Sequence, residues 1–215
     1  MRPSSPLPKF RRRKAERPDE IVAAALAVFS EKGFAAARLD DIAVRAGVSK
    51  GAIYLYFATK EDIFRAVVEQ AIAPNLHGLQ GLAASHPGPL PALLDAFVSR
   101  VIGVIAQGPV GGVAKMVIGE ARNFPELARV WHDRLVGPAI GALTAAIAAA
   151  QARGEVRPGD PRQYAVSLIA PLVVGVVWRE TFVPVGAPPF DLPSLARQHV
   201  DTLLRGMLTQ TDAAP

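Results

Sequence analysis

A short run of residues around position 50 has the side-chain types and spacing that suit contact with a nucleic acid. Ser49 is a good N-cap for a helix whose first residues are Lys50, Gly51 and Ala52. A helix with small residues at its N-terminal end can approach base edges in the major groove of DNA, where a lysine can donate to base acceptors. The run therefore predicts a helix tip that contacts bases.

Two tyrosines, Tyr54 and Tyr56, follow in the same run. A tyrosine hydroxyl can donate to phosphate while its ring packs against the protein. On a helix, a spacing of two residues places the rings on different faces, so at least one should be exposed, and we favour phosphate contact over a place in the core. For Lys50 the alternative is a solvated side chain, but its position directly after the cap favours DNA. Their apolar neighbours are expected in the core: Ile42, Ala43, Val48, Ile53 and Phe57.

Three helices must hold this run in place. Apolar residues recur at helical spacing between Pro18, which can open a helix as its first residue, and Gly33, which ends it. A second helix is predicted over residues 39–46, ended by Gly47, and a third over residues 50–56. Three short helices with a glycine-containing turn before the third form the helix-turn-helix pattern, in which the third helix enters the major groove.

The rest of the chain also has helical periodicity. Thr59 and Asp62 form a capping-box pattern for a helix from Lys60 to about Ala73, where Pro74 breaks it. A Gly/Pro-rich stretch at residues 86–91 is the clearest loop. Further helices are expected at residues 91–107, 110–123, 125–152, 161–182 and 192–209. No alternating run demands a strand, so we expect an all-α chain with about nine helices.

Composition narrows the class of protein. The 215 residues carry a net charge of +5 and no cysteine, which excludes thiolate ligands and cysteine nucleophiles and fits a reducing intracellular setting. Residues 1–17 hold seven of the basic residues and a single glutamate. Such a basic arm attracts a polyanion without sequence specificity, and the alternative is a disordered solubilising tail. Apolar runs at residues 135–150 and 165–178 fall short of the roughly 18 consecutive apolar residues of a membrane span, so we expect buried helices there.

Recognised motifs for catalysis are absent from the sequence. The four histidines, at positions 77, 86, 132 and 199, are scattered and give no paired metal-ligand spacing. There is also no nucleophile elbow, phosphate-binding loop or dinucleotide-binding fingerprint. We therefore expect no metal, no cofactor and no enzymatic activity; turnover in a hydrolysis or transfer screen would revive the enzyme alternative.

The segment from Leu39 to Phe64, LDDIAVRAGVSKGAIYLYFATKEDIF, with Gly33-Phe34 before it, resembles the TetR/AcrR family of transcriptional regulators. The stretch GEARNFPEL at residues 119–127 is similar, less specifically, to the regulatory domain of AcrR/AefR-like members. The resemblance implies a disordered basic arm (1–17), a helix-turn-helix domain (18–64) and a helical domain (65–215) that binds a ligand and a second subunit.

The resemblance also implies roles for individual residues. Lys50, Gly51 and Ala52, after the cap Ser49, lie at the base-contacting end of the recognition helix, and Tyr54, Tyr56 and Lys60 hold phosphates. Arg45 on the second helix reaches the backbone or a base edge. Family members often have a threonine before the second helix, where it caps the helix and touches phosphate. This sequence has Ala37-Arg38, so Arg38 can still reach a phosphate but the cap is lost, at a cost of about 1 kcal/mol.

For the helical domain, the resemblance implies a dimer interface on the last two long helices and a pocket for a small molecule. Apolar residues at helical spacing predict the interface, and the alternative is that they complete the core of one subunit. The interface candidates are Leu168, Leu172, Val176, Leu195, Val200, Leu203 and Met207. The pocket candidates are Phe97, Val101, Met116, Glu120, Trp131, Leu135, Trp178 and Phe182. Most such residues are core in any helical protein, and Glu120 fits an ion pair or a solvated face as well as a polar contact to a ligand.

Together these features predict a bacterial, cytoplasmic repressor, associated with the nucleoid when bound to DNA. It would bind a palindromic operator as a homodimer and be released by a small hydrophobic or amphipathic effector. It would not associate with a membrane. The alternative among DNA-binding functions is a nonspecific architectural protein that binds through the basic arm alone. Competition by unrelated DNA would distinguish the two functions. Activation in place of repression is also open.

Overall fold

The computed structural model of the chain describes residues 13–72, 88–107 and 110–209. Over these residues the regular structure is helical, apart from an isolated antiparallel bridge between Val156 and Leu208. When helices that directly follow one another are counted as one, the described residues contain nine helices. The predicted all-α fold is thus confirmed. Residues 1–12 of the basic arm, the predicted break at Pro74 and residues 86–87 of the predicted loop lie outside the described residues.

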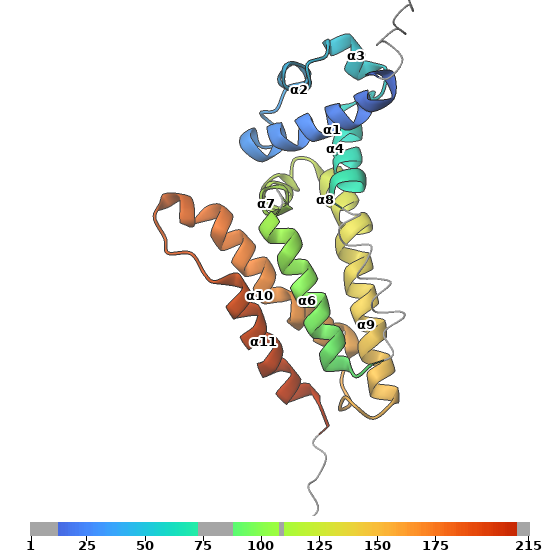
Figure 1. Ribbon diagram of the computed structural model, residues 1–215, viewed down its shortest axis with the longest axis vertical. Helices are drawn as coiled ribbons and strands as arrows, with labels where there is room; N and C mark the ends of the chain where they lie inside the picture. Colours follow the sequence, from blue (N-terminus) through green and yellow to red (C-terminus); the bar gives the residue numbers. More distant parts are fainter. Residues whose placement is uncertain (1–12, 73–87, 108–109, 210–215) are drawn as a thin grey trace, which may run out of the picture.

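Four helices gather at one end of the molecule (Figure 1). They are α1 (Arg13–Lys32), α2 (Leu39–Ala46), α3 (Lys50–Tyr54) and α4 (Lys60–Ala66), which continues as a π-helix, η1 (Val67–Ile72). The expected start of the first helix at Pro18 is wrong, because α1 begins at Arg13 and contains Pro18. The residues that precede this proline include Lys14, Ala15 and Glu16, whose high helix propensity favours the extra turn.

Glycines and capping residues set several ends of these helices as predicted, although α3 ends at Tyr54 and not at residue 56. Gly33 and Gly47 adopt φ values of +77° and +66°, a left-handed conformation that costs glycine little. Ser49 Oγ accepts a hydrogen bond from the Ala52 amide at 3.2 Å and caps α3. Thr59 and Asp62 form the predicted capping box of α4. These caps fix the short α3 between two turns of defined geometry.

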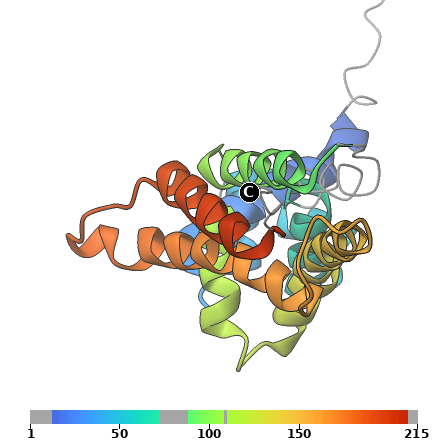
Figure 2. The same cartoon turned by 90° about the horizontal axis from the view of Figure 1, so that it is seen from below.

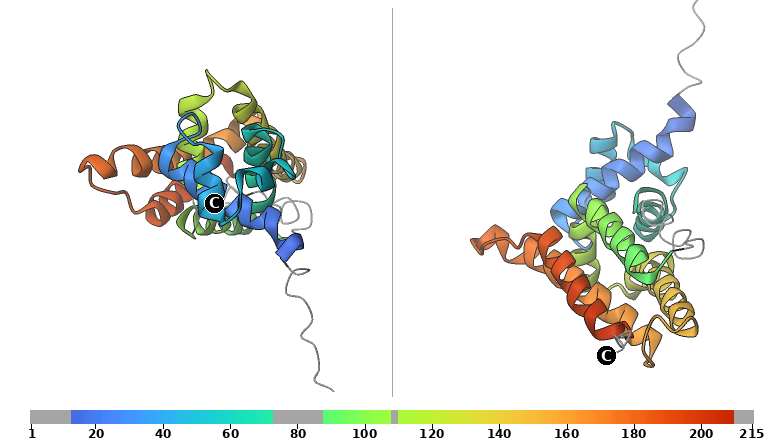
Figure 3. Two further views of the ribbon diagram at one scale, coloured as in Figure 1. Left: turned by 90° about the horizontal axis from the view of Figure 1, so that it is seen from above. Right: turned by 60° about the horizontal axis from the view of Figure 1, so that its bottom comes forward.

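The remaining helices extend away from this end. They are α6 (Leu90–Gln107), α7 (Val110–Glu120), α8 (Pro125–Trp131), the π-helix η2 (His132–Val136), α9 (Gly137–Ala152), α10 (Pro161–Thr181), the 3-10 helix η3 (Val183–Val185) and α11 (Leu192–Met207). Figure 1 shows α7 and α8 between the N-terminal helices and the long α6, α9, α10 and α11. Seen from below and from above, α10 and α11 project together to one side (Figures 2 and 3).

Two hydrophobic cores hold these helices together. The first joins α1, α2, α3, α4 and η1 to α7 and α8, and Phe34 lies inside it with its ring packed against those of Phe29, Phe64 and Phe124. The second joins α6, α9, α10 and α11. The first core crosses residue 64, so α7 and α8 pack directly against the N-terminal helices, and the predicted domain boundary at residue 64 stays a prediction.

Candidate nucleic-acid interface

The core beneath α3 determines which of its residues face outward. Ile53 is fully buried and anchors the helix, while Ala52 lies half-buried beside it. Ser49, Lys50 and Gly51 are exposed at the N-terminal end. The tip of α3 therefore presents one amine and a glycine with no side chain, which allows a close approach to another molecule.

The two tyrosines occupy different environments, as their spacing predicted. Tyr54 is 53% exposed, whereas Tyr56 is half-buried and packs against the first core. The ring of Tyr56 thus has the packed position, and Tyr54 is the more exposed of the two residues. Contact of either hydroxyl with phosphate stays a prediction.

Two of the expected DNA-contacting side chains are paired with carboxylates of the chain itself. Arg45 on α2 donates two hydrogen bonds to Glu31 on α1, both 2.7 Å long. This pairing lowers the pKa of Glu31 and raises that of Arg45. Lys50 Nζ lies 3.1 Å from Asp40 Oδ2. All four side chains are exposed, and such surface pairs are weak, so a phosphate or a base can take the place of either carboxylate.

Arg38 stands at the N-cap of α2, exposed, and its side chain makes no capping hydrogen bond, as expected. Asp41 partly compensates, because its carboxylate accepts a hydrogen bond from the Arg38 amide at 3.2 Å. Asp41 also lies 2.9 Å from Lys32 Nζ on α1. The lysine, helped by the Arg38 amide, lowers the pKa of Asp41 below its ordinary value. Asp41 therefore ties the start of α2 to α1.

Lys60 does not have the position expected of a phosphate contact. Its Nζ donates to the carbonyl oxygens of Phe34 and Ala37 at 2.6 and 3.1 Å, and lies 4.3 Å from the centre of the Phe34 ring. The amine thus caps carbonyl groups of the segment between α1 and α2. The reason is local, since Lys60 is the first residue of α4, and α4 packs against the end of α1.

Glu120, a predicted pocket residue, binds backbone amides of its own chain. It is the last residue of α7, and its two carboxylate oxygens accept hydrogen bonds from the amides of Phe34 and Ala35 at 2.8 and 2.7 Å. These amides follow Gly33, where a Cβ would lie 2.8 Å from Glu120 Oε1. Glu120 therefore fastens α7 to the segment that leads from α1 into α2.

The other pocket candidates do not surround one cavity. Met116, Trp131 and Leu135 belong to the first core, whereas Phe97 and Val101 belong to the second. At the far end of α10, the ring of Trp178 packs against those of Phe182 and Phe190, with centroids 5.0 and 4.8 Å apart, and its indole N–H donates to the Pro188 carbonyl. Most of these large side chains fill the two cores, so the structure does not bring the set together around one of the described hollows, and their role in a pocket stays a prediction.

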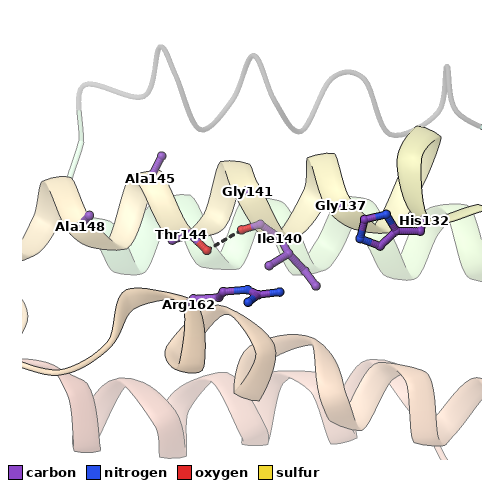
Figure 4. A pocket seen from close by; sticks show the side chains of 8 residues that line it. All are labelled: His132, Gly137, Ile140, Gly141, Thr144, Ala145, Ala148 and Arg162. Atoms are coloured by element: carbon purple, nitrogen blue, oxygen red, sulfur yellow. Dashed lines mark hydrogen bonds between the residues drawn. The ribbon is translucent and has the colours of Figure 1, made fainter. Parts of the chain in front are cut away.

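A hollow of about 480 Å³ lies elsewhere, along one face of α9 (Figure 4). Small residues of α9 form its wall, His132 lies at one end and Arg162 of α10 lies opposite. Its lining residues are His132, Gly137, Ile140, Gly141, Thr144, Ala145, Ala148 and Arg162. The surface is mostly apolar with a few polar groups at the edge.

The predicted dimer interface faces the wrong way. Five of its seven residues, Leu168, Leu172, Val176, Val200 and Met207, are at most 7% exposed within one subunit, and Leu195 and Leu203 are half-buried. The opposite face of α10 carries the exposed apolar side chains Val166, Val173 and Val174, at 43, 46 and 59%. The apolar face that the sequence analysis assigned to the interface thus packs in the core of its own subunit.

Sequence reasoning missed the partners that organise this surface. Asp40 and Glu31 were not considered as partners of Lys50 and Arg45, and the contact of Glu120 with the α1–α2 segment was not foreseen. These pairs are separated by 10, 14 and 85 or more residues and come from different elements. No local spacing rule connects them, so only the packing of the helices could reveal them.

Comparison with protein families gives two matches. Residues 21–67 match the model of bacterial regulatory proteins of the tetR family. Residues 87–188 match the model of a tetracyclin repressor-like C-terminal domain. The first match covers the helices that surround α3, and the second covers most of the helical remainder.

Individual relatives agree with this result. Over 88 residues the chain is 39% identical to the HTH-type transcriptional repressor BepR of Brucella suis, a match that covers 40% of this chain and 42% of BepR. The fold is similar to that of SmeT, solved with triclosan (TM-score 0.74, 22% identity, 93% and 95% of the two chains), and to FadR of Bacillus subtilis, solved with stearoyl-CoA (0.71, 20%, 87% and 98%). At these identities the two structures support the fold alone.

Proposed function

Since the chain belongs to the TetR family of bacterial regulatory proteins, we propose that it is a transcriptional repressor that binds a palindromic operator as a dimer and is released by a small effector. Members of this family are soluble DNA-binding regulators of the cytoplasm and not enzymes. The observation that carries the proposal is the exposed tip of α3, held by buried Ile53 and the Ser49 cap with Lys50 and Gly51 facing outward.

The proposed dimer uses the exposed face of α10. Val166, Val173 and Val174 share one side of the helix, since residues seven and eight positions apart lie on one face. By length and composition the segment Pro161–Val185 could cross a membrane, as could Pro125–Ala152. A helix that is apolar all round is normally covered on all sides, and in a soluble family a second subunit is the natural cover for α10. Two-fold symmetry would then supply two α3 tips for successive turns of DNA, about 34 Å apart.

The proposed effector is apolar or amphipathic. The hollow along α9 is walled by small and apolar residues, with Arg162 able to orient an acidic or polar group at its edge. The ligands in the SmeT and FadR structures, triclosan and stearoyl-CoA, are both rich in apolar groups. Release would follow from linkage, because the effector favours a different separation of the α3 tips. The factor by which bound effector lowers the affinity for DNA equals the factor by which bound DNA lowers the affinity for the effector.

Selection from a pool of random duplexes tests the proposal directly. The purified full-length chain should enrich a palindrome with half-sites one helical turn apart and bind it about a thousandfold more tightly than unrelated DNA. Analytical ultracentrifugation should give a dimer at micromolar concentration. Failure to enrich any motif, with binding that unrelated DNA competes away equally, would favour the nonspecific architectural alternative. Binding of triclosan with no change in operator affinity would contradict the linkage between the two sites for that ligand.

A further inference from the structure

A carboxylate on the proposed DNA-binding surface needs an explanation. Asp40 lies in the first turn of α2 and Lys50 is the first residue of α3. Their side chains meet across the turn between the two helices, with Asp40 Oδ2 3.1 Å from Lys50 Nζ. The Asp40 side chain is 63% exposed. A negative charge here repels phosphates, so it lowers the affinity for DNA in general unless it makes a favourable contact of its own.

The fold does not require Asp40 in the way that it requires its neighbour. Asp41 accepts the Arg38 amide and pairs with Lys32 on α1, so it joins α2 to α1. Asp40 pairs outward with Lys50, and an exposed ion pair of this kind adds little to stability. Two adjacent acids of the same helical turn thus do different things, and only Asp40 is placed beside the tip of α3.

Lys50 and Asp40 place a hydrogen-bond donor beside an acceptor, which complements the major-groove edge of one kind of base pair. We propose that Asp40 and Lys50 together recognise a G·C pair in each half-site, with Lys50 donating to guanine O6 and N7 and Asp40 accepting from the cytosine N4 amino group; this rests on the proposed function. In the base pair, guanine O6 and cytosine N4 are themselves hydrogen-bonded about 2.9 Å apart. The Lys50 amine and the Asp40 carboxylate lie 3.1 Å apart, which is close to this spacing. The amine can therefore face guanine O6 while the carboxylate faces cytosine N4.

An A·T pair fits this arrangement less well. Its major-groove edge has two acceptors, adenine N7 and thymine O4, but the adenine N6 amino group lies between them. The lysine therefore cannot donate to two adjacent acceptors as it can on guanine O6 and N7. Phosphate also fits less well, because it satisfies Lys50 but repels Asp40. The pair therefore favours a specific base pair over the DNA backbone, which is the discrimination that a specific regulator needs.

The test compares motifs selected from random duplexes by the wild-type chain, by Asp40→Ala and by the matched control Asp41→Ala. We expect the wild-type motif to contain one G·C position per half-site at which Asp40→Ala lowers the preference for that pair about tenfold, with the other positions unchanged. Asp41→Ala should keep every preference, even if it lowers the melting temperature. An unchanged motif with Asp40→Ala would overturn the inference, whereas a wild-type chain that selects no motif would overturn the proposed function first.

A second measurement uses the unaltered protein. N4-methylcytosine at the assigned position places a methyl group in the major groove where Asp40 would accept. It should weaken wild-type binding about tenfold and leave binding by Asp40→Ala unchanged. If the methyl group has no effect on the wild type, or weakens both proteins equally, Asp40 does not contact the cytosine and the inference is wrong. This outcome also separates a base contact from a role in which Asp40 only orients Lys50.

Discussion

Replacing Glu120 with alanine should detach α7 from the segment between α1 and α2. The carboxylate accepts two hydrogen bonds, from the Phe34 amide at 2.8 Å and from the Ala35 amide at 2.7 Å. The Phe34 amide is partly buried and the Ala35 amide is exposed. Water can therefore replace the second bond readily, but it replaces the first only by opening the segment.

The size of the effect follows from these environments. A hydrogen bond to a charged group contributes about 1.5–3 kcal/mol, and exposure reduces this value. We expect the partly buried bond to supply most of a total loss of about 2 kcal/mol in the free energy of unfolding. For a chain of this length, that corresponds to a fall of roughly 4–8 °C in melting temperature. Exchange of the Phe34 amide with solvent should accelerate by up to about 30-fold, since each 1.4 kcal/mol is a factor of ten, and exchange of the exposed Ala35 amide should accelerate less.

Glu126→Ala is the matched control. Glu126 lies in the first turn of α8, close in sequence, and pairs with Arg129 on the exposed surface of the same helix. Its loss should cost less than about 1 kcal/mol. Thermal melts at one fixed protein concentration and amide exchange by mass spectrometry provide the readouts. If Glu120→Ala melts like Glu126→Ala, or if the two amides exchange at wild-type rates, the reasoning about this contact is refuted.

Three further predictions concern the subunit interface, acid stability and the basic arm. Val174→Lys should give a monomer in sedimentation at low micromolar concentration, whereas Leu168→Ala should lower stability by about 2–5 kcal/mol and stay dimeric; a dimeric Val174→Lys would count against the α10 face. Asp41 has a lowered pKa, so its pairing stabilises the fold above the ordinary carboxyl value and is lost as the pH falls through the lowered one. The loss of stability caused by Lys32→Ala in urea titrations should therefore shrink below about pH 4, and a constant difference would contradict this. Deletion of residues 2–12 should reduce the salt dependence of operator binding by roughly 0.9 for each phosphate that the arm neutralises, with base preference unchanged; an unchanged slope would show that the arm neutralises none.

Helix boundaries were predictable because they depend on neighbours in the sequence. Ser49 and Thr59 cap their helices, Gly47 ends α2 with a positive φ, and Pro125 and Pro161 stand in the first turns of α8 and α10. Each of these signals acts within one helical turn. α1 departs from the prediction, because favourable propensity before Pro18 outweighed the preference of proline for the first turn. The ends of α3 at Tyr54 and of α7 at Glu120 also come before the predicted residues 56 and 123.

The inner and outer faces of α10 were not predictable in the same way. Apolar residues occur all round this helix, so periodicity cannot say which side meets the core of its own subunit. Leu168 and Leu172 are larger than Val173 and Val174, and the larger pair fills the core. The choice depends on the shapes of α9 and α11, which pack against α10, and those shapes are set by residues far away in the sequence.

The segment between α1 and α2 is held by charges from both sides. Glu120 on α7 accepts from its amides, while Lys60 on α4 donates to its carbonyl groups. Both attach to Phe34, whose buried ring cannot move freely. Hydrogen bonds of 2.6–2.8 Å are broken when the atoms separate beyond about 3.5 Å, so a displacement of α7 relative to α4 of about 1 Å breaks one of these contacts unless the segment or the two side chains move with it. Because that segment leads directly into α2, these contacts connect the position of α7 to the start of α2.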